Sequence, residues 1–157
     1  MVRIGIIIVC HNIEKHINVD VFVKHFNKAK NIELCFVNNA SKDNTYQILK
    51  DIKEISKKDF SILDIKRYKS DQSAIRSGSR YMFSQFNLNH IGFVSSNILI
   101  KKQYSLCSLI KHIRANQDFI LQYSKQLKED NPPKQTLFQS VFSITEYLDK
   151  SKVQLST

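Results

Sequence analysis

The sequence predicts a single α/β domain in which a mainly parallel sheet lies between two layers of helices. Short apolar, β-branched runs alternate along the chain with segments whose apolar residues recur every three or four positions. Alternation of this kind is typical of parallel strands joined by right-handed helical crossovers. The length of 157 residues and the hydrophobic fraction of 42% are those of one globular domain with one core.

The first strand is expected at Ile4–Val9, an almost continuous β-branched run of the kind that is covered on both faces of a sheet. The run ends in the polar break at residues 10–12. Asn18 stands before the next periodic segment and is the predicted N-cap of a helix. The apolar face of that helix consists of Val19, Phe22, Val23 and Phe26.

The turn after the second strand is the place around which the rest of the chain is organised. The strand is expected at Leu34–Val37, and it stops in the small polar residues 38–41. A helix is predicted over residues 42–55, with Ser41 as its N-cap and Asp43 compensating the dipole in its first turn. Because ligands bind at the carboxyl edge of open parallel sheets, a binding site is expected at this turn.

Three more elements complete the regular part of the chain. They are a strand at Phe60–Ile65, a helix at Asp71–Phe86 and a strand at His90–Val94. Gly78, inside the helix, is predicted to mark close packing of the helix on the sheet. A basic linker at Lys66–Ser70 precedes this helix, and the fourth strand ends in the polar residues 95–97.

The last third of the chain has weaker periodicity. Lys102–Arg114 and Thr136–Lys150 have apolar residues at helical spacing and are predicted as helices. Phe119–Leu121 is a short apolar run that predicts a fifth strand. Lys125–Lys134 is charged, contains both prolines of the chain and is predicted as a loop.

Basic residues outnumber acidic ones. The chain has 24 Lys and Arg against 14 Asp and Glu, a net charge of +10, which attracts polyanions such as nucleic acids, anionic membranes and phosphorylated ligands. The lysines are spread along the whole chain, so a solvated surface is a better interpretation than a nucleic-acid footprint. A basic nucleic-acid-binding α/β domain is the least favoured alternative.

The cysteines and the apolar runs bear on the cellular compartment. Cys10, Cys35 and Cys107 form no CxxC pair, and the first two lie in apolar runs. Buried free thiols of this kind fit a reducing cytoplasm better than a disulfide framework. No apolar window approaches the roughly 20 residues of a membrane span, and the N-terminal run is too short for a signal peptide. A soluble cytoplasmic protein, at most peripheral at a membrane, is therefore expected.

Four short words at the predicted strand ends resemble those of family-2 glycosyltransferases of the GT-A fold. They are VCHNIE at residues 9–14, VNNASKDNT at 37–45, YKSDQSAIRSG at 68–78 and SSN at 95–97. The corresponding family words read P-T/C-Y/H-N-E, V-D-D-G-S-x-D-x-T, N-x-G-K-x-x-A-x-R-x-G and D-A-D. The similarity runs from about Ile4 to Asn97, and it is closest to members resembling dolichyl-phosphate sugar transferases.

The resemblance implies a Rossmann-like three-layer sandwich that binds a UDP- or GDP-linked sugar and transfers the sugar to a lipid-phosphate or polysaccharide acceptor. It divides the single domain 1–157 into a nucleotide-sugar-binding half, 1–97, and a shortened acceptor half, 98–157. It also implies Mg²⁺ or Mn²⁺ at the D-A-D word, which places Asn97 at the metal. The positions that it assigns to nucleotide binding are Cys10, His11, Asn12, Glu14, Asn38, Asn39, Ser41, Lys69, Arg76, Ser95 and Ser96.

The chain departs from the family words where those words carry the chemistry. Asn38 and Asn39 replace the carboxylates that accept the N–H of uracil or guanine, and an amide oxygen accepts that bond without a charge. Residues 95–97 offer hydroxyls and an amide, which are poor ligands for a hard dication. Ser70 and Asp71 replace a glycine and a lysine, so a negative charge lies where the diphosphate is expected.

Two main hypotheses follow. In the first, the chain is a glycosyltransferase with weakened chemistry, in which Arg76 and the basic linker hold the diphosphate. In the second, the chain is a non-catalytic remnant that serves as a binding or assembly module. No catalytic residue is predicted, because spacing does not select one general base among the acidic residues of the acceptor half. These residues are Asp118, Glu129, Asp130, Glu146 and Asp149.

Overall fold

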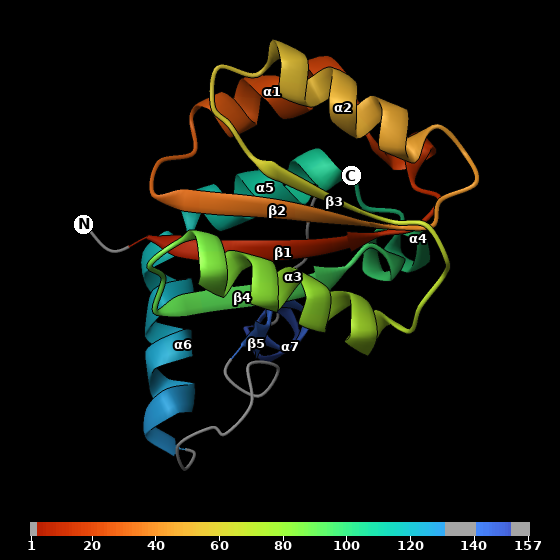
Figure 1. The fold of residues 1–157 in the computed structure, drawn as a ribbon. Coiled ribbons are helices and arrows are strands. Elements are labelled where there is room, and N and C mark those ends of the chain that lie inside the picture. The colour runs from red at the N-terminus through yellow and green to blue at the C-terminus, as the bar shows by residue number, and fades with distance from the viewer. Residues whose placement is uncertain (1–2, 131–140, 152–157) are drawn as a thin grey trace.

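The computed structural model describes residues 3–130 and 141–151, and its centre is a five-stranded parallel sheet in the order β3-β2-β1-β4-β5 (Figure 1). The predicted α/β class with a parallel sheet is therefore confirmed. The strands are β1 Ile4–Cys10, β2 Ile32–Asn39, β3 Ser61–Ile65, β4 His90–Ser95 and β5 Phe142–Ser143. The helices are the short 3-10 turn η1 Glu14–His16 and the α-helices α1 Val19–Asn27, α2 Thr45–Ile55, α3 Asp71–Gln85, α4 Asn97–Lys102, α5 Leu106–Ala115, α6 Gln117–Asp130 and α7 Ile144–Lys150.

β1 lies in the middle of the sheet, as its continuous apolar sequence requires. Residues Ile4–Cys10 pair with β2 on one side, and Ile4–Val9 pair with β4 on the other. All seven residues of β1 are buried. A strand that is apolar on both faces is stable only where helices shield both faces.

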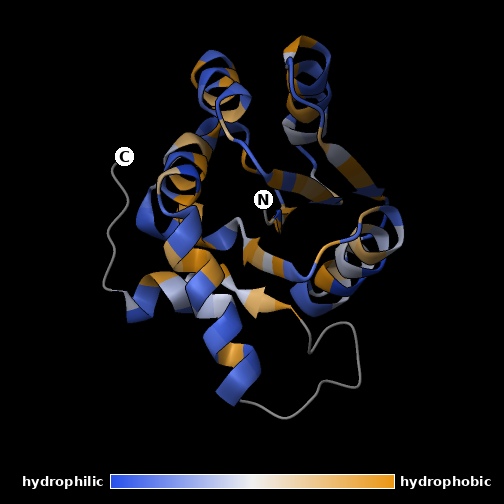
Figure 2. Cartoon of the chain, turned by 90° about the vertical axis from the view of Figure 1, so that its left-hand side faces the viewer, coloured by the Kyte–Doolittle hydropathy of each residue, from blue (hydrophilic) through white to orange (hydrophobic). Residues whose placement is uncertain are grey.

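Helices cover both faces of the sheet. Ile6 and Ile8 of β1 point into the larger part of the core, together with apolar residues of α1, α2, α5, α6 and α7. Ile7 and Val9 point to the opposite face, where α3 packs. In Figure 2, predominantly orange, apolar strands lie between helices of mixed colour. The arrangement is the three-layer sandwich that the alternating pattern predicts.

Four buried phenylalanines form a group that joins β2 to α1. The ring centroids of Phe22 and Phe36 are 5.9 Å apart, and those of Phe36 and Phe60 are 5.2 Å apart. Phe26 closes the group, with centroid distances of 5.7 Å to Phe22 and 5.5 Å to Phe60. Aromatic pairs at these distances add to the stabilisation that comes from burying their area.

Two local predictions are confirmed. A Cβ atom on Gly78 of α3 would lie 2.8 Å from Cγ2 of Ile7 and 3.1 Å from Cγ2 of Val37, so this glycine lets the helix approach the sheet closely. Asn18 caps α1, because its Oδ1 accepts the N–H of Val21 at 3.2 Å.

The helix after β2 begins later than predicted. α2 starts at Thr45, three residues after position 42, and Ser41 is not its N-cap. Asn44 precedes the helix, and its side chain makes no capping hydrogen bond. The carboxylate of Asp43 instead accepts the N–H of Thr45. Asp43 was predicted in the first turn, where it would compensate the helix dipole. It lies before the helix instead and contacts Thr45, the first helical residue, through hydrogen bonds.

The predicted helix at Lys102–Arg114 is confirmed from Leu106 onward, in α5, but Lys102 is the last residue of a separate helix, α4, that was not predicted. Gln103 has a φ of 56°, a left-handed conformation that ends α4. The hydroxyl of Ser105 accepts the N–H of Ser108 at 3.1 Å and caps the start of α5. These two local signals interrupt an apolar periodicity that continues across the break.

The predicted strand at Phe119–Leu121 is wrong. These residues lie in α6, where Ile120 and Ser124 are buried and Phe119 is 64% exposed. A run of three apolar residues is too short to distinguish a strand from one turn of an amphipathic helix. The predicted loop is also wrong at residues 125–130, which continue α6, and residues 131–134 lie outside the described residues.

The fifth strand lies at Phe142–Ser143, inside the segment predicted as a helix. The prediction of a helix is correct only from Ile144, where α7 begins, and residues 136–140 lie outside the described residues. The hydroxyl of Ser143 accepts the N–H of Glu146 and caps α7, which fixes the change from strand to helix.

Among residues 3–130 and 141–151, no helix combines the length and the apolar composition that a membrane crossing requires.

Candidate functional site

The carboxyl ends of three neighbouring strands bring many of the predicted site residues to one edge of the sheet. In the register of β1, Cys10 lies beside Asn38 of β2 and Val9 lies beside Ser95 of β4. His11 follows β1 directly. Side chains and loops from distant parts of the sequence therefore meet at this edge, as the fold class predicts.

His11 connects the ends of all three strands. Its backbone N–H donates to the hydroxyl of Ser96 at 3.2 Å, after β4. Its ring Nδ1 lies 2.7 Å from the carbonyl oxygen of Asn39, at the end of β2. A carbonyl oxygen only accepts, so Nδ1 carries the proton and Nε2 accepts from the amide of Asn12 at 3.1 Å. The rings of Tyr68 and His11 pack in a T-shaped arrangement, with centroids 4.9 Å apart.

Asn12 holds the loop that leads into α2. Its φ of 51° is left-handed, a conformation that asparagine adopts more readily than most residues. Its Oδ1 accepts the N–H of Lys42 at 2.7 Å and that of Asp43 at 3.4 Å. Its own backbone N–H donates to the hydroxyl of Ser41 at 3.1 Å. Ser41 therefore ties two loops together instead of capping a helix.

Asp43 is the main anchor between the β1 loop and α2. Oδ1 accepts from the N–H and the hydroxyl of Thr45, at 2.9 and 2.6 Å, and Oδ2 accepts the N–H of Glu14 at 3.2 Å. Partial burial acts to raise the pKa of Asp43, but these hydrogen bonds outweigh it, and the pKa is lowered. The ionised carboxylate thus accepts three hydrogen bonds from the protein itself.

Substitution of Asp43 by asparagine is expected to lower the free energy of unfolding by about 2 kcal/mol at neutral pH, because the new amide NH₂ would face the N–H of Glu14. The lowered pKa stabilises the fold above the ordinary value of 3.8, and this stabilisation is lost as the pH falls below that value. Urea titrations at neutral and acid pH should show the difference from wild type shrinking on acidification. The exposed Asp51 provides the control substitution, Asp51→Asn, which should change stability by less than about 0.5 kcal/mol at either pH.

Asn39 is fully buried, and both polar atoms of its amide form hydrogen bonds within the protein. Its Nδ2 donates to the carbonyl of Lys69 at 2.8 Å, and its Oδ1 accepts the N–H of Lys69 at 3.0 Å. The side chain therefore fixes the path of the linker before α3. That linker carries the exposed cations predicted for diphosphate binding, which are Lys66, Arg67 and Lys69.

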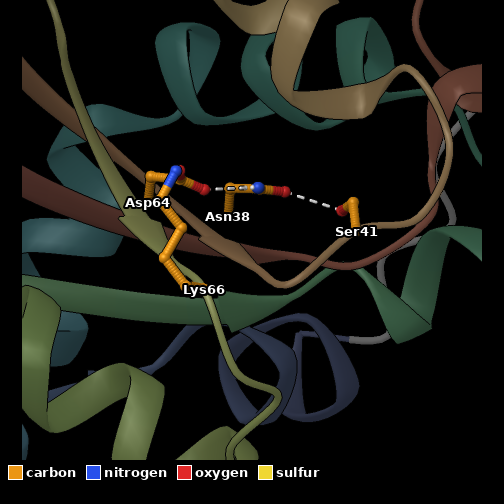
Figure 3. A network of polar contacts seen from close by, with 4 residues as sticks. All are labelled: Asn38, Ser41, Asp64 and Lys66. Carbon is orange, nitrogen blue, oxygen red and sulfur yellow. Dashed lines mark hydrogen bonds and ion pairs between the residues drawn. The ribbon is translucent and has the colours of Figure 1, made fainter.

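Asn38 is also buried, but it is part of a network that reaches the surface (Figure 3). Its Nδ2 donates to Oδ1 of Asp64 at 2.9 Å, and its Oδ1 accepts the hydroxyl of Ser41 at 2.6 Å. The other oxygen of Asp64 is paired with the ammonium of Lys66. Asp64 was not among the predicted site residues, although one signal pointed to it: it is the single charged residue in the strand SILDI.

The end of β4 carries hydroxyl and amide groups. Ser96 is almost fully buried, and the hydroxyl of Ser95 accepts the N–H of Asn97 at 3.3 Å. The amide of Asn97 donates to Oδ2 of Asp71 at 3.3 Å, so Asp71 is the carboxylate that contacts this position. Mg²⁺ and Mn²⁺ beside a diphosphate are usually held by one or two carboxylates together with phosphate oxygens, and residues 95–97 themselves supply no carboxylate.

The donor chemistry at the end of β4 therefore does not fit the metal that the resemblance implies. One carboxylate with an amide and two hydroxyls is a weak donor set, and the hydroxyls already serve the backbone of His11 and Asn97. Within residues 3–130 and 141–151, no group of three or more His, Cys, Asp or Glu side chains could hold a metal ion.

The remaining predicted residues lie at different depths. Cys10 is fully buried in the core, and burial together with the neighbouring Cys35 raises the pKa of its thiol, so the thiol is not available to a ligand. Arg76 is exposed on α3. Glu14 lines an open hollow of ≈ 440 Å³ beside the site, together with Asn12, Lys42 and other residues.

Comparison with known proteins identifies the family. The sequence profile of "Glycosyl transferase family 2" matches residues 5–154. Similar solved structures include S. aureus TarS residues 1–349, at 16% identity and a TM-score of 0.47, covering 60% of this chain and 27% of that chain. A second TarS structure has 16% identity and a TM-score of 0.44, covering 60% of this chain and 16% of that chain. The matched region thus spans about a quarter of these proteins or less, and no curated protein matches the sequence. Because the family profile covers nearly the whole chain, the chain belongs to glycosyl transferase family 2.

Proposed function

We propose that this chain binds a nucleotide-diphosphate sugar at the carboxyl edge of its sheet and does not carry out metal-dependent sugar transfer. The observation that carries the proposal is the neutral end of β4, where Ser95, Ser96 and Asn97 stand in place of two carboxylates. The family in general uses a nucleotide-sugar donor, and the loops that would contact it here are held by hydrogen bonds between strands.

Positive charge supports binding of the diphosphate. Lys66, Arg67 and Lys69 are exposed in the linker before α3, and the backbone of Lys69 is fixed by Asn39. Exposed cations at the edge of a sheet attract a diphosphate through their charge without the help of a metal. Asp71 opposes this attraction only in part, since its carboxylate accepts a hydrogen bond from Asn97.

Calorimetric titration with UDP and GDP, each with and without Mn²⁺, tests the proposal. Binding of one nucleotide with the same affinity in both conditions is the expected result. Absence of binding at millimolar nucleotide would overturn it. The substitution Lys69→Met, in the exposed part of the linker, should weaken binding of the nucleotide that binds, whereas the exposed Lys57→Met, on the loop after α2, should not.

The second candidate is sugar transfer to a lipid-phosphate or polysaccharide acceptor. The observation that favours it is the contact between Asp71 and Asn97. This contact brings one carboxylate next to residues 95–97, which correspond to the D-A-D word of the family. Transfer would require binding that Mn²⁺ strengthens, together with release of nucleoside diphosphate from a UDP- or GDP-sugar. The same titrations, repeated with Asp71→Asn, therefore separate the two candidates.

A further inference from the structure

We propose that Asp64 and Lys66 read the edge of the nucleotide base, in place of the carboxylate that the end of β2 lacks. The inference rests on the proposed nucleotide binding and goes beyond it, because it assigns recognition to β3. The ligand class is a base that presents a ring N–H beside a carbonyl oxygen, as uracil and guanine do. Cytosine and adenine present the opposite pattern, a ring nitrogen acceptor beside an NH₂ donor.

The position of Asp64 follows from the register of the sheet. Asn38 of β2 lies directly beside Asp64 of β3 in the parallel pairing. Asp64 is two residues after Ile62, so the two side chains leave the same face of the sheet, the one on which the larger part of the core lies. The side chains of Asn38 and Asp64 point toward each other in Figure 3 and share the 2.9 Å hydrogen bond. The carboxylate of Asp64 thus lies on β3, one strand away from the end of β2, where the family word has its carboxylates.

Asp64 is the more accessible member of the pair. Its side chain is 17% exposed, whereas Asn38 is 2% exposed. A carboxylate has about four lone-pair positions, and Asn38 and Lys66 each use one. Partial burial acts to raise the pKa of Asp64, but the hydrogen bonds from Lys66 and Asn38 outweigh it, and the pKa is lowered. Asp64 is therefore an ionised group that can only accept, which suits a base N–H.

Lys66 supplies the complementary donor. Its side chain is 83% exposed, and its ammonium carries three N–H groups, of which Asp64 accepts one. The ammonium also lies 5.6 Å from the centroid of the Tyr46 ring, which helps to hold it beside Asp64. An acceptor and a donor side by side match N3–H and O4 of uracil, or N1–H and O6 of guanine.

Asn38 and Ser41 keep this pair in one orientation. The hydroxyl of Ser41 donates to Oδ1 of Asn38, so the NH₂ group of Asn38 must face Asp64. An asparagine at position 64 would accept that same N–H through its oxygen and present its own NH₂ to the ligand. The substitution Asp64→Asn thus reverses the polarity of the recognising group while keeping the contact with Asn38.

The test is calorimetric titration of the whole chain with UDP, GDP, CDP and ADP in the absence of metal. Wild type is expected to bind UDP or GDP about tenfold or more tightly than CDP and ADP, since a hydrogen bond to a charged group contributes that much. Whether UDP or GDP binds more tightly identifies which of the two bases the pair accepts. Asp64→Asn should lose this preference, because its NH₂ would then favour the ring nitrogen of cytosine while Lys66 would still favour O4 of uracil. The control Asp51→Asn, an exposed carboxylate on α2, should leave all four affinities unchanged.

Two results would overturn the inference. If Asp64→Asn changes all four affinities equally, or none of them, Asp64 has no role in base recognition although nucleotide binding itself stands. If wild type binds none of the four, the proposed function fails and the inference fails with it. Should Asp64→Asn not fold, Lys66→Met changes an exposed side chain, and it should weaken UDP and GDP binding by a larger factor than CDP and ADP binding, because only the loss of linker charge is common to all four.

Discussion

Replacement of Asn39 by aspartate is expected to lower the free energy of unfolding by about 3 kcal/mol at neutral pH. The substitution restores the residue type of the family word, but it places a carboxylate oxygen against the carbonyl of Lys69, where the amide now donates at 2.8 Å. The site is fully buried, so water cannot compensate for the lost hydrogen bond. Reversible urea unfolding of the variant and of wild type measures the difference.

The loss should depend on pH in a defined direction. The carboxyl group introduced by Asn39→Asp can donate to the carbonyl of Lys69 only when it is protonated, so its pKa is raised in the folded state. Its contribution to stability is then complete below the ordinary value of about 3.9 and is lost as the pH rises through the raised value. Asn87→Asp, at an exposed position, is the control. A loss below about 1 kcal/mol that does not change with pH would contradict this account.

Replacement of Phe36 by alanine is expected to destabilise the fold by about 4 kcal/mol, the largest effect predicted for a single substitution here. Phe36 is fully buried at the centre of the aromatic group, and its ring contacts those of Phe22 and Phe60. Its removal leaves a cavity between β2 and α1 that the neighbouring strands cannot close. Denaturant midpoints, together with an unchanged m-value, would show that native stability has fallen.

Phe119→Ala is the matched control for Phe36→Ala. Phe119 lies on α6 and is 64% exposed, so truncation should cost less than about 1 kcal/mol. Similar losses for the two variants would mean that the phenylalanine group is not the centre of the core.

The first four strands could be predicted from the sequence because each contains a short apolar run, and the runs of β1, β2 and β4 are largely buried in the sheet. Ile4–Val9 is apolar at every position except one glycine. An amphipathic helix would need apolar residues only at every third or fourth position, so the continuous run indicates a buried strand. The last strand could not be predicted, because Phe142–Ser143 is two residues long and merges with the periodicity of α7. The apolar run Phe119–Leu121 resembles a strand more closely than Phe142–Ser143 does. It is nevertheless helical, because Ile120 packs into the core from α6.

For the site, the sequence predicted which residues lie at the strand ends but not which groups they bind. Asn38 and Asn39 are adjacent in the chain, yet their side chains leave opposite faces of the sheet and meet different partners. Asp64 was missed because its contact with Asn38 depends on the register of β3 against β2. That register cannot be read from the local sequence of either strand. The choice between Ser41 and Asp43 as the group that caps α2 likewise depended on the loop after β1, about 30 residues away in the sequence.

The hydrogen bonds between the β1 loop and the α2 loop have a consequence for motion. Residues 11–14 are bonded to residues 39–45 through His11, Asn12 and the N–H groups of Ile13 and Glu14. These loops can separate only when several of these hydrogen bonds break together, so local opening is disfavoured. A ligand that binds there meets backbone whose conformational entropy has already been lost, so its binding free energy is not reduced by ordering of these loops.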